Sequence, residues 1–162
     1  MYHTEQDGIV IRAARPQDAK AICRVQNAAV RRLPEGCPPE VVSAWSGACS
    51  PEAVRQEMIQ GVAGFVALVR KELVGFAVLA GDLVRVVCVH PAHAGSGLGS
   101  ALLARLEEEA RRRGVRLLRL NASPKAKPFY QARGYQVVRE ASPQIPLDLD
   151  LPCLEMAKTI AS

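Results

Sequence analysis

Short apolar, β-branched runs alternate along the chain with longer segments whose apolar positions recur every three or four residues. This pattern predicts strands at residues 8–14, 64–70, 72–80, 82–90, 115–120, 135–140 and 153–159. It predicts helices at residues 16–33, 51–60, 98–113 and 124–133, and a further short helix fits residues 40–48. Because strands and helices interleave only partly, in the order β-α-α-β-β-β-α-β-α-β-β, we expect a mixed α/β (α+β) fold with a central twisted sheet. The strand at 82–90, the helix at 98–113 and the strand at 115–120 form a βαβ unit with a parallel crossover.

The helix at 98–113 has the clearest pattern in the chain. Leu98, Leu102, Leu106 and Ala110 form one apolar stripe. Its last part pairs three Glu with three Arg at i,i+4 spacing, namely Glu107–Arg111, Glu108–Arg112 and Glu109–Arg113. We therefore expect this charged block to be a solvated helix face.

Length and composition favour one globular domain covering residues 1–162. The apolar runs are far shorter than the ~20 residues that span a bilayer, and residues 1–7 lack the pattern of a signal peptide, so we expect a cytoplasmic protein with no membrane partner. The five cysteines are odd in number and have no CxxC spacing. The sequence thus predicts neither a disulfide framework nor a metal site.

Charge changes this picture, because it is unevenly distributed. The whole chain carries a net +5, whereas residues 91–139 contain ten Lys or Arg and three Asp or Glu, a net +7. A basic half in an otherwise nearly neutral chain indicates an anionic partner, which is either a phosphate-rich ligand or a nucleic acid.

A glycine-rich turn lies between the strand at 82–90 and the helix at 98–113. Gly95, Gly97 and Gly99 alternate there, and the helix begins at once. Alternate glycines let backbone N–H groups converge, and a helix N-terminus adds unpaired N–H groups and a positive dipole end. The turn can therefore hold a pyrophosphate. It is neither a P-loop, since no Lys follows, nor a Rossmann fingerprint, since the spacing is GxGxG.

A second motif follows the strand at 115–120. Ala126, Phe129, Tyr130, Gly134 and Tyr135 lie at the spacing Ala-x-x-hydrophobic-Tyr-x-x-x-Gly-aromatic. Together with Gly97 and Gly99, this motif makes the chain resemble the GCN5-related N-acetyltransferase (GNAT) family over essentially its whole length. The resemblance implies a GNAT-like fold in which the parallel strands 4 and 5, at 82–90 and 115–120, splay apart.

The resemblance also implies acetyl-CoA as the cofactor, bound between the splayed strands. By family position the binding residues are Cys88, Val89, Ala94, Gly95, Ser96, Gly97, Leu98, Gly99, Ser100, Asn121, Ser123, Ala126, Phe129 and Tyr130. The chain departs from the family at Ala94, where an Arg or Gln usually begins the glycine loop. We expect this departure to weaken cofactor binding, unless His93 partly substitutes.

The implied reaction is direct transfer of an acetyl group to a primary amine. Tyr130 matches the general acid that protonates the departing thiolate, and the Val89 N–H is placed to stabilise the oxyanion. Asp82 and His90, at the two ends of the fourth strand, are the candidate bases. Arg31 and Trp45 lie in the segment that usually covers the acceptor site.

Two other functions remain open at this point. A nucleic-acid-binding domain would suit the basic residues Arg111, Arg112, Arg113, Arg116, Arg119, Lys125 and Lys127, although aromatic residues make up only 4% of the chain and these arginines largely have Glu partners. We therefore expect no nucleic-acid partner. A catalytically silent acyl-CoA sensor would explain the missing Arg or Gln. The sequence identifies neither the acceptor, which is a small-molecule or peptide amine, nor the oligomeric state, for which a homodimer is the commonest arrangement.

Overall fold

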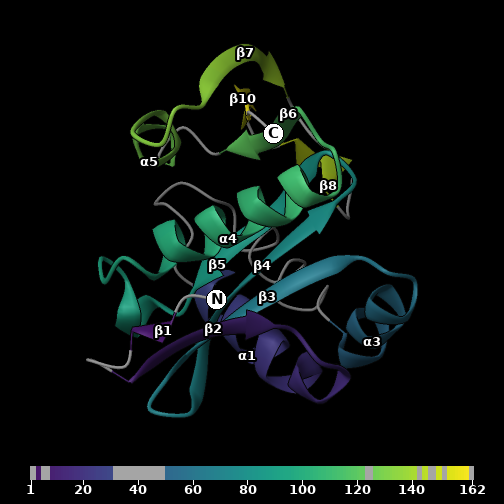
Figure 1. Cartoon of the computed structure of the whole chain (residues 1–162), viewed down its shortest axis with the longest axis vertical. Coiled ribbons are helices and arrows are strands. Elements are labelled where there is room, and N and C mark those ends of the chain that lie inside the picture. Colours follow the sequence, from purple (N-terminus) through teal and green to yellow (C-terminus); the bar gives the residue numbers. More distant parts are fainter. Residues whose placement is uncertain are drawn as a thin grey trace.

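A mixed sheet runs through the protein, with helices packed on both of its faces (Figure 1). The structure is a computed structural model, and it describes residues 3–4, 8–30, 50–122, 126–141, 144–145, 149–150 and 153–160. The eight strands of the sheet follow the order β1-β2-β3-β4-β5-β6-β10-β7. Their bounds are β1 (His3–Thr4), β2 (Ile9–Ala13), β3 (Ala63–Val69), β4 (Glu72–Ala80), β5 (Leu83–Val89), β6 (Leu117–Ala122), β7 (Gln136–Ala141) and β10 (Cys153–Thr159).

The predicted fold class and element order are confirmed. The helices are α1 (Ala19–Val30), α3 (Pro51–Ile59), α4 (Leu98–Arg112) and α5 (Lys127–Gln131), with short 3-10 helices at Pro16–Asp18 and Pro91–His93. β5 and β6 are parallel, and every other pair of neighbouring strands in the sheet is antiparallel. The sequence pattern did not predict the short hairpin β8 (Gln144–Ile145) and β9 (Leu149–Asp150). The predicted helix at 40–48 lies outside the described residues.

The two faces of the sheet have separate cores, because side chains alternate along each strand. The α4 face buries Leu102, Leu106 and Ala110 of the predicted stripe against residues such as Phe65 and Leu79. On the opposite face, Ile22 and Val25 of α1 pack on strand residues that include Val66 and Phe76. Each face thus buries an amphipathic helix.

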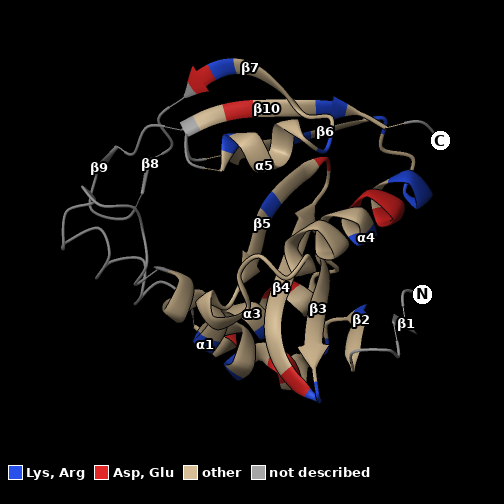
Figure 2. Ribbon diagram, turned by 90° about the vertical axis from the view of Figure 1, so that its left-hand side faces the viewer, with Lys and Arg blue, Asp and Glu red and all other residues tan. Residues whose placement is uncertain are grey.

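The charged end of α4 differs from the prediction. Glu109 does bind Arg113, at 2.9 Å, and it also binds Arg112 at 2.6 Å. Glu107 instead turns inward and binds Lys158 of β10 at 2.8 Å. Glu107 and Glu109 are only 7% and 4% exposed, so the prediction of a solvated face is wrong for these two residues. Figure 2 shows the acidic and basic blocks together at the C-terminal end of α4.

The cysteine prediction also needs one correction. Cys23 of α1 is disulfide-bonded, so the expectation that the chain forms no disulfide is wrong there. Its partner is not among the described side chains, whereas Cys88 is free and buried. No cluster of three or more His, Cys, Asp or Glu that could hold a metal occurs among the residues described above. No helix in these ranges is long and apolar enough to cross a membrane.

Candidate functional site: a gap between two parallel strands

β5 and β6 pair only where β5 begins. Leu83 lies opposite Arg119 and Val84 opposite Leu120, and the Arg119 N–H donates to the Asp82 carbonyl at 2.9 Å. Beyond Val84 the two strands have no further register pairs, although β5 continues to Val89. The predicted splay of strands 4 and 5 is therefore confirmed, and its apex lies next to Arg85.

A β-bulge at Arg85 sets the direction of the β5 backbone inside the gap. Leu79 of β4 pairs with Val84 and Val78 pairs with Val86, so Arg85 is an extra residue between them. The His90 N–H donates to the Val74 carbonyl at 2.7 Å. Because backbone groups alternate in direction along a strand, those of Cys88 also face β4, and those of Val87 and Val89 face the gap. The structure thus places Val87, rather than the predicted Cys88, beside the gap.

The glycine loop lies at the open end of β5. Gly95 and Gly97 have φ values of 78° and 84°, a region that glycine adopts without strain. Gly97 caps α4 without a side-chain hydrogen bond, and the first helical bond of α4 runs from the Ala101 N–H to the Gly97 carbonyl. The N–H groups of Leu98, Gly99 and Ser100 therefore have no acceptor within the helix. This is the arrangement of free N–H groups from which the sequence analysis predicted an anion site.

A cavity of about 500 Å³, here called the glycine-loop cavity, joins this loop to the gap. Its walls come from β5, the loop, the first turn of α4, and α5. A Cβ added at Gly99 would lie 3.4 Å from the Phe129 ring, so a side chain there would crowd the space between α4 and α5. The lining residues are Val87, Val89, His93, Ala94, Gly95, Ser96, Gly97, Leu98, Gly99, Ser100, Ala126, Phe129, Tyr130 and Arg133. The cavity thus brings together most of the residues predicted to bind the cofactor.

Besides Val87, the residue of this cavity that sequence reasoning missed is Arg133. Its Nη1 donates to the Phe129 carbonyl at 2.8 Å, and its guanidinium carbon lies 3.8 Å from the centroid of the Phe129 ring. Its Nε is buried without a hydrogen-bond partner among the described residues. Within the described part of the chain, Arg133 and His93 are the only basic side chains that line the cavity. The sequence feature that could have identified Arg133 is its position immediately before Gly134 and Tyr135 of the second motif.

Tyr130 lies where the resemblance predicted it. It is buried in the wall of the cavity, and its ring packs edge-to-face on Phe129 at 5.0 Å and on Tyr135 at 5.8 Å between centroids. Burial, with a smaller contribution from the Cys88 thiol, raises the pKa of Tyr130 to about 12. The phenol is therefore protonated at neutral pH, which is the state that a proton donor needs.

The two predicted bases lie outside the cavity, at opposite ends of β5. Arg119 binds Asp82 through two hydrogen bonds of 2.8 and 3.1 Å, and this pairing lowers the pKa of the Asp82 carboxyl. His90 accepts the Ala92 N–H through Nδ1 at 3.1 Å, which leaves Nε2 for other contacts. Asn121 is exposed on β6 and does not line the cavity. Ser123, Arg31 and Trp45 lie outside the described residues.

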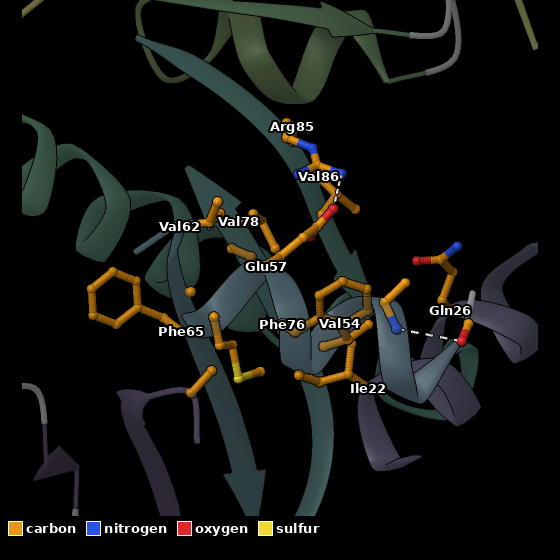
Figure 3. A pocket seen from close by; sticks show the side chains of 16 residues that line it. Ile22, Gln26, Val54, Glu57, Val62, Phe65, Phe76, Val78, Arg85 and Val86 are labelled. Atoms are coloured by element: carbon orange, nitrogen blue, oxygen red, sulfur yellow. Dashed lines mark hydrogen bonds and ion pairs between the residues drawn. The ribbon is translucent and has the colours of Figure 1, made fainter. Parts of the chain in front are cut away.

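A second cavity, of about 300 Å³, lies on the opposite face of the sheet, between α1, α3 and strands β3 to β5; we call it the α3 cavity (Figure 3). Glu57 of α3 and Arg85 of β5 both line it, and they bind each other at 2.9 Å. The two cavities share β5, because Val86 lines the α3 cavity and Val87 the glycine-loop cavity.

Comparison with known proteins agrees with this geometry. A model of the acetyltransferase (GNAT) domain matches residues 33–145. A crystal structure of a GCN5-related N-acetyltransferase from Rhodopseudomonas palustris is 29% identical, covers 93% of this chain and 95% of its own, and superposes with a TM-score of 0.85. No curated protein matches the chain.

Two more distant structures share the fold. One is a PaiA N-acetyltransferase from Thermoplasma acidophilum in complex with coenzyme A; it is 19% identical, with a TM-score of 0.77 over 94% of this chain and 99% of its own. The other is YncA, a putative acetyltransferase from Salmonella typhimurium, with its cofactor acetyl-CoA; it is 22% identical, with a TM-score of 0.75 over 96% of this chain and 95% of its own.

Proposed function

Because the chain belongs to the GNAT acetyltransferase domain family, we propose that it is an acetyl-CoA-dependent N-acetyltransferase that moves an acetyl group directly to a primary amine. The observation that carries this proposal is the gap between β5 and β6, which opens onto the glycine loop at the N-terminus of α4. A strand with unpaired backbone groups that leads to a helix N-terminus suits a ligand with an amide-containing arm and a pyrophosphate.

The residues present fit this cofactor. The backbone groups of Val87 and Val89 face the gap, and those of Val89 together with the Val87 carbonyl would bind the amides of the pantetheine arm. The N–H groups of Leu98 to Ser100 and the loop from Ala94 to Gly97 would hold the pyrophosphate. Arg133 supplies a cation at the same cavity, with one guanidinium N–H still unpaired among the described residues. This cation stands in for the side chain that the family has at Ala94.

The chain's own groups then assist transfer. Bound acetyl-CoA supplies an activated thioester. The Val87 N–H faces the gap nearer to its apex than the predicted Val89 N–H, and it donates to the carbonyl oxygen as negative charge develops there. Tyr130 is protonated at neutral pH and donates a proton to the departing sulfur. Of the two predicted bases, Asp82 is the less suitable, because its pairing with Arg119 lowers its proton affinity.

Two measurements test the proposal. Calorimetry should show binding of acetyl-CoA and of CoA, and a thiol-release assay with a panel of primary amines should show acceptor-dependent turnover. Tight binding without transfer to any amine would favour the acyl-CoA sensor instead. Absence of binding would contradict both functions. Salt-sensitive binding of DNA by the same preparation would favour a nucleic-acid-binding function.

A further inference from the structure

The α3 cavity reaches the sheet at the apex of the β5–β6 gap. Arg85, the bulge residue, follows directly after the last paired residue, Val84, and lines this cavity. Val86 and Val87 are consecutive and project to opposite faces, so one strand is the wall between the α3 cavity and the glycine-loop cavity. A molecule in the α3 cavity would therefore lie on the opposite face of the sheet from the cofactor, next to the unpaired stretch of β5 where its amine can reach the thioester through the gap.

The inside of the α3 cavity is apolar. Figure 3 shows the side chains of Ile22, Val54 and Phe76 below the Glu57–Arg85 pair. Phe76 and Ile22 are 2% and 5% exposed, so these walls are fixed parts of the core. A cavity of about 300 Å³ is at the small end of ligand sites, which favours a compact occupant with an apolar side chain.

The entrance of the α3 cavity carries one anion and one cation. Among the described residues that line it, Glu57 and Arg85 are the only charged ones, and their side chains are 38% and 42% exposed. Both groups are thus bound to each other and still accessible from solvent. A ligand with a single charge would pair with one of them and leave the other without its partner. A zwitterion would pair with both at once, with its carboxylate on the Arg85 fork and its ammonium on Glu57.

We propose that the acceptor is a free amino acid with an apolar side chain, bound in the α3 cavity between Arg85 and Glu57. This inference rests on the proposed function. The transfer forms the C–N bond of an N-acetyl amino acid and breaks the C–S bond of the thioester. Of the two protons that the ammonium loses, one leaves to solvent through Glu57. The other restores Tyr130 after Tyr130 has protonated the thiolate.

The test compares amino acids with amines that lack only the carboxylate. L-Leucine is paired with isoamylamine and L-phenylalanine with phenethylamine, and kcat/KM is measured for each at saturating acetyl-CoA. In the unaltered protein we expect each amino acid to be preferred by roughly ten- to a hundredfold, the effect of one charge-assisted pair. In Arg85→Met the preference should fall to within about twofold. Arg85→Lys should keep an intermediate preference, because it keeps the charge without the fork.

Arg55→Met is the matched control. Arg55 lies on α3, the helix that carries Glu57, pairs with Glu52 at 3.5 Å and does not line the cavity, so its variant should keep the full preference. Equal use of amino acid and amine, or a preference that survives Arg85→Met, would overturn the inference. Exclusive use of peptide amines would also overturn it. None of these results would affect the proposed function, which fails only if acetyl-CoA does not bind or no amine is acetylated.

Discussion

Tyr130 shows how one buried side chain can have a packing role and a chemical role. Its ring packs against Phe129 and Tyr135. Burial also raises the pKa of its hydroxyl to about 12. An ordinary tyrosine is already protonated at physiological pH, so the effect of burial is to make this phenol a weaker acid. Because its pKa lies above the ~8.5 of a free thiol, transfer of the proton to the thiolate is uphill and is completed when the substrate amine reprotonates Tyr130.

Tyr130→Phe separates these two roles. It keeps the ring contacts and removes only the proton donor, so we expect turnover to fall by roughly 10²–10⁴-fold. The dissociation constant of acetyl-CoA, measured by calorimetry, should change less than about twofold, because a few tenths of a kcal/mol is the scale of a conservative change. Tyr135→Phe is the control, since Tyr135 is buried outside the cavity and should leave turnover unchanged. Full turnover in Tyr130→Phe would show that another group supplies the proton.

A second prediction concerns Arg133, which we expect to replace the Arg or Gln that the family usually has at the position of Ala94. We expect Arg133→Met to weaken CoA binding by roughly ten- to a hundredfold, because one charge-assisted contact is lost. Binding of pantetheine, which has no phosphate, should be unchanged. Adding Ala94→Arg to Arg133→Met should restore most of the affinity, whereas Ala94→Arg alone should add little. Titrations with CoA at low salt compare the four proteins, namely the unaltered protein, the two single variants and the double variant.

The control for Arg133 is Arg112→Met, at the far end of α4, where the side chain is 77% exposed. That variant should bind CoA normally. If Arg133→Met also binds CoA normally, the cation that replaces the family residue lies elsewhere. A large gain from Ala94→Arg alone would show that nothing replaces it.

At the scale of elements, a glycine in the left-handed backbone conformation flanks each end of α4. Gly97 precedes α4 and Gly114 follows it, with φ values of 84° and 81°. A Cβ would have no neighbour within 4 Å at either position. Both positions therefore favour glycine for backbone reasons alone, and only Gly97 lies at a cavity.

This symmetry gives a controlled test of the glycine loop. Gly97→Ala and Gly114→Ala should each lower the free energy of unfolding by roughly 1–3 kcal/mol, the cost of a left-handed non-glycine residue. Only Gly97→Ala should weaken acetyl-CoA binding, because its methyl group would enter the site of the pyrophosphate. Urea unfolding and calorimetry measure the two effects separately. Equal binding by both variants would contradict the assignment of the loop as the anion site.

Element order and most element bounds followed from the sequence, because they depend on local periodicity. β10 was predicted at residues 153–159, where the structure has it. Its place between β6 and β7 was not predictable, because a strand's neighbours depend on contacts distant in sequence. The bulge at Arg85 was missed for a similar reason. The bulge shifts the register of β5 by one residue, so the backbone groups of Val87, and not those of the predicted Cys88, face the gap.

The α3 cavity was the feature least predictable from the sequence. Glu57 and Arg85 are 28 residues apart and belong to a helix and a strand with no shared motif. The resemblance predicted where the cofactor lies, because its motifs are contiguous. The acceptor site is assembled from separate elements, and no contiguous pattern marks it.

At the scale of the whole molecule, the gap that makes the site also weakens the sheet. β5 and β6 share two register pairs, so little backbone hydrogen bonding joins the half with β1 to β5 to the half with β6, β7 and β10. The buried pair of Glu107 and Lys158 crosses this boundary from α4 to β10, with bonds of 2.8 and 3.1 Å. We infer that this pair holds the two halves in register on either side of the gap.

Removing one partner tests this inference. Lys158→Met leaves the Glu107 carboxylate, whose side chain is 9% exposed, without its cation, and should lower the free energy of unfolding by roughly 3–5 kcal/mol. Adding Glu107→Gln removes the stranded charge and should recover most of that loss. Breaking the exposed Arg55–Glu52 pair with Arg55→Met should cost no more than about 1 kcal/mol. Urea unfolding curves give all three values. If Lys158→Met is as mild as Arg55→Met, the pair does not hold the halves together, and the packing of α4 on the sheet must do so alone.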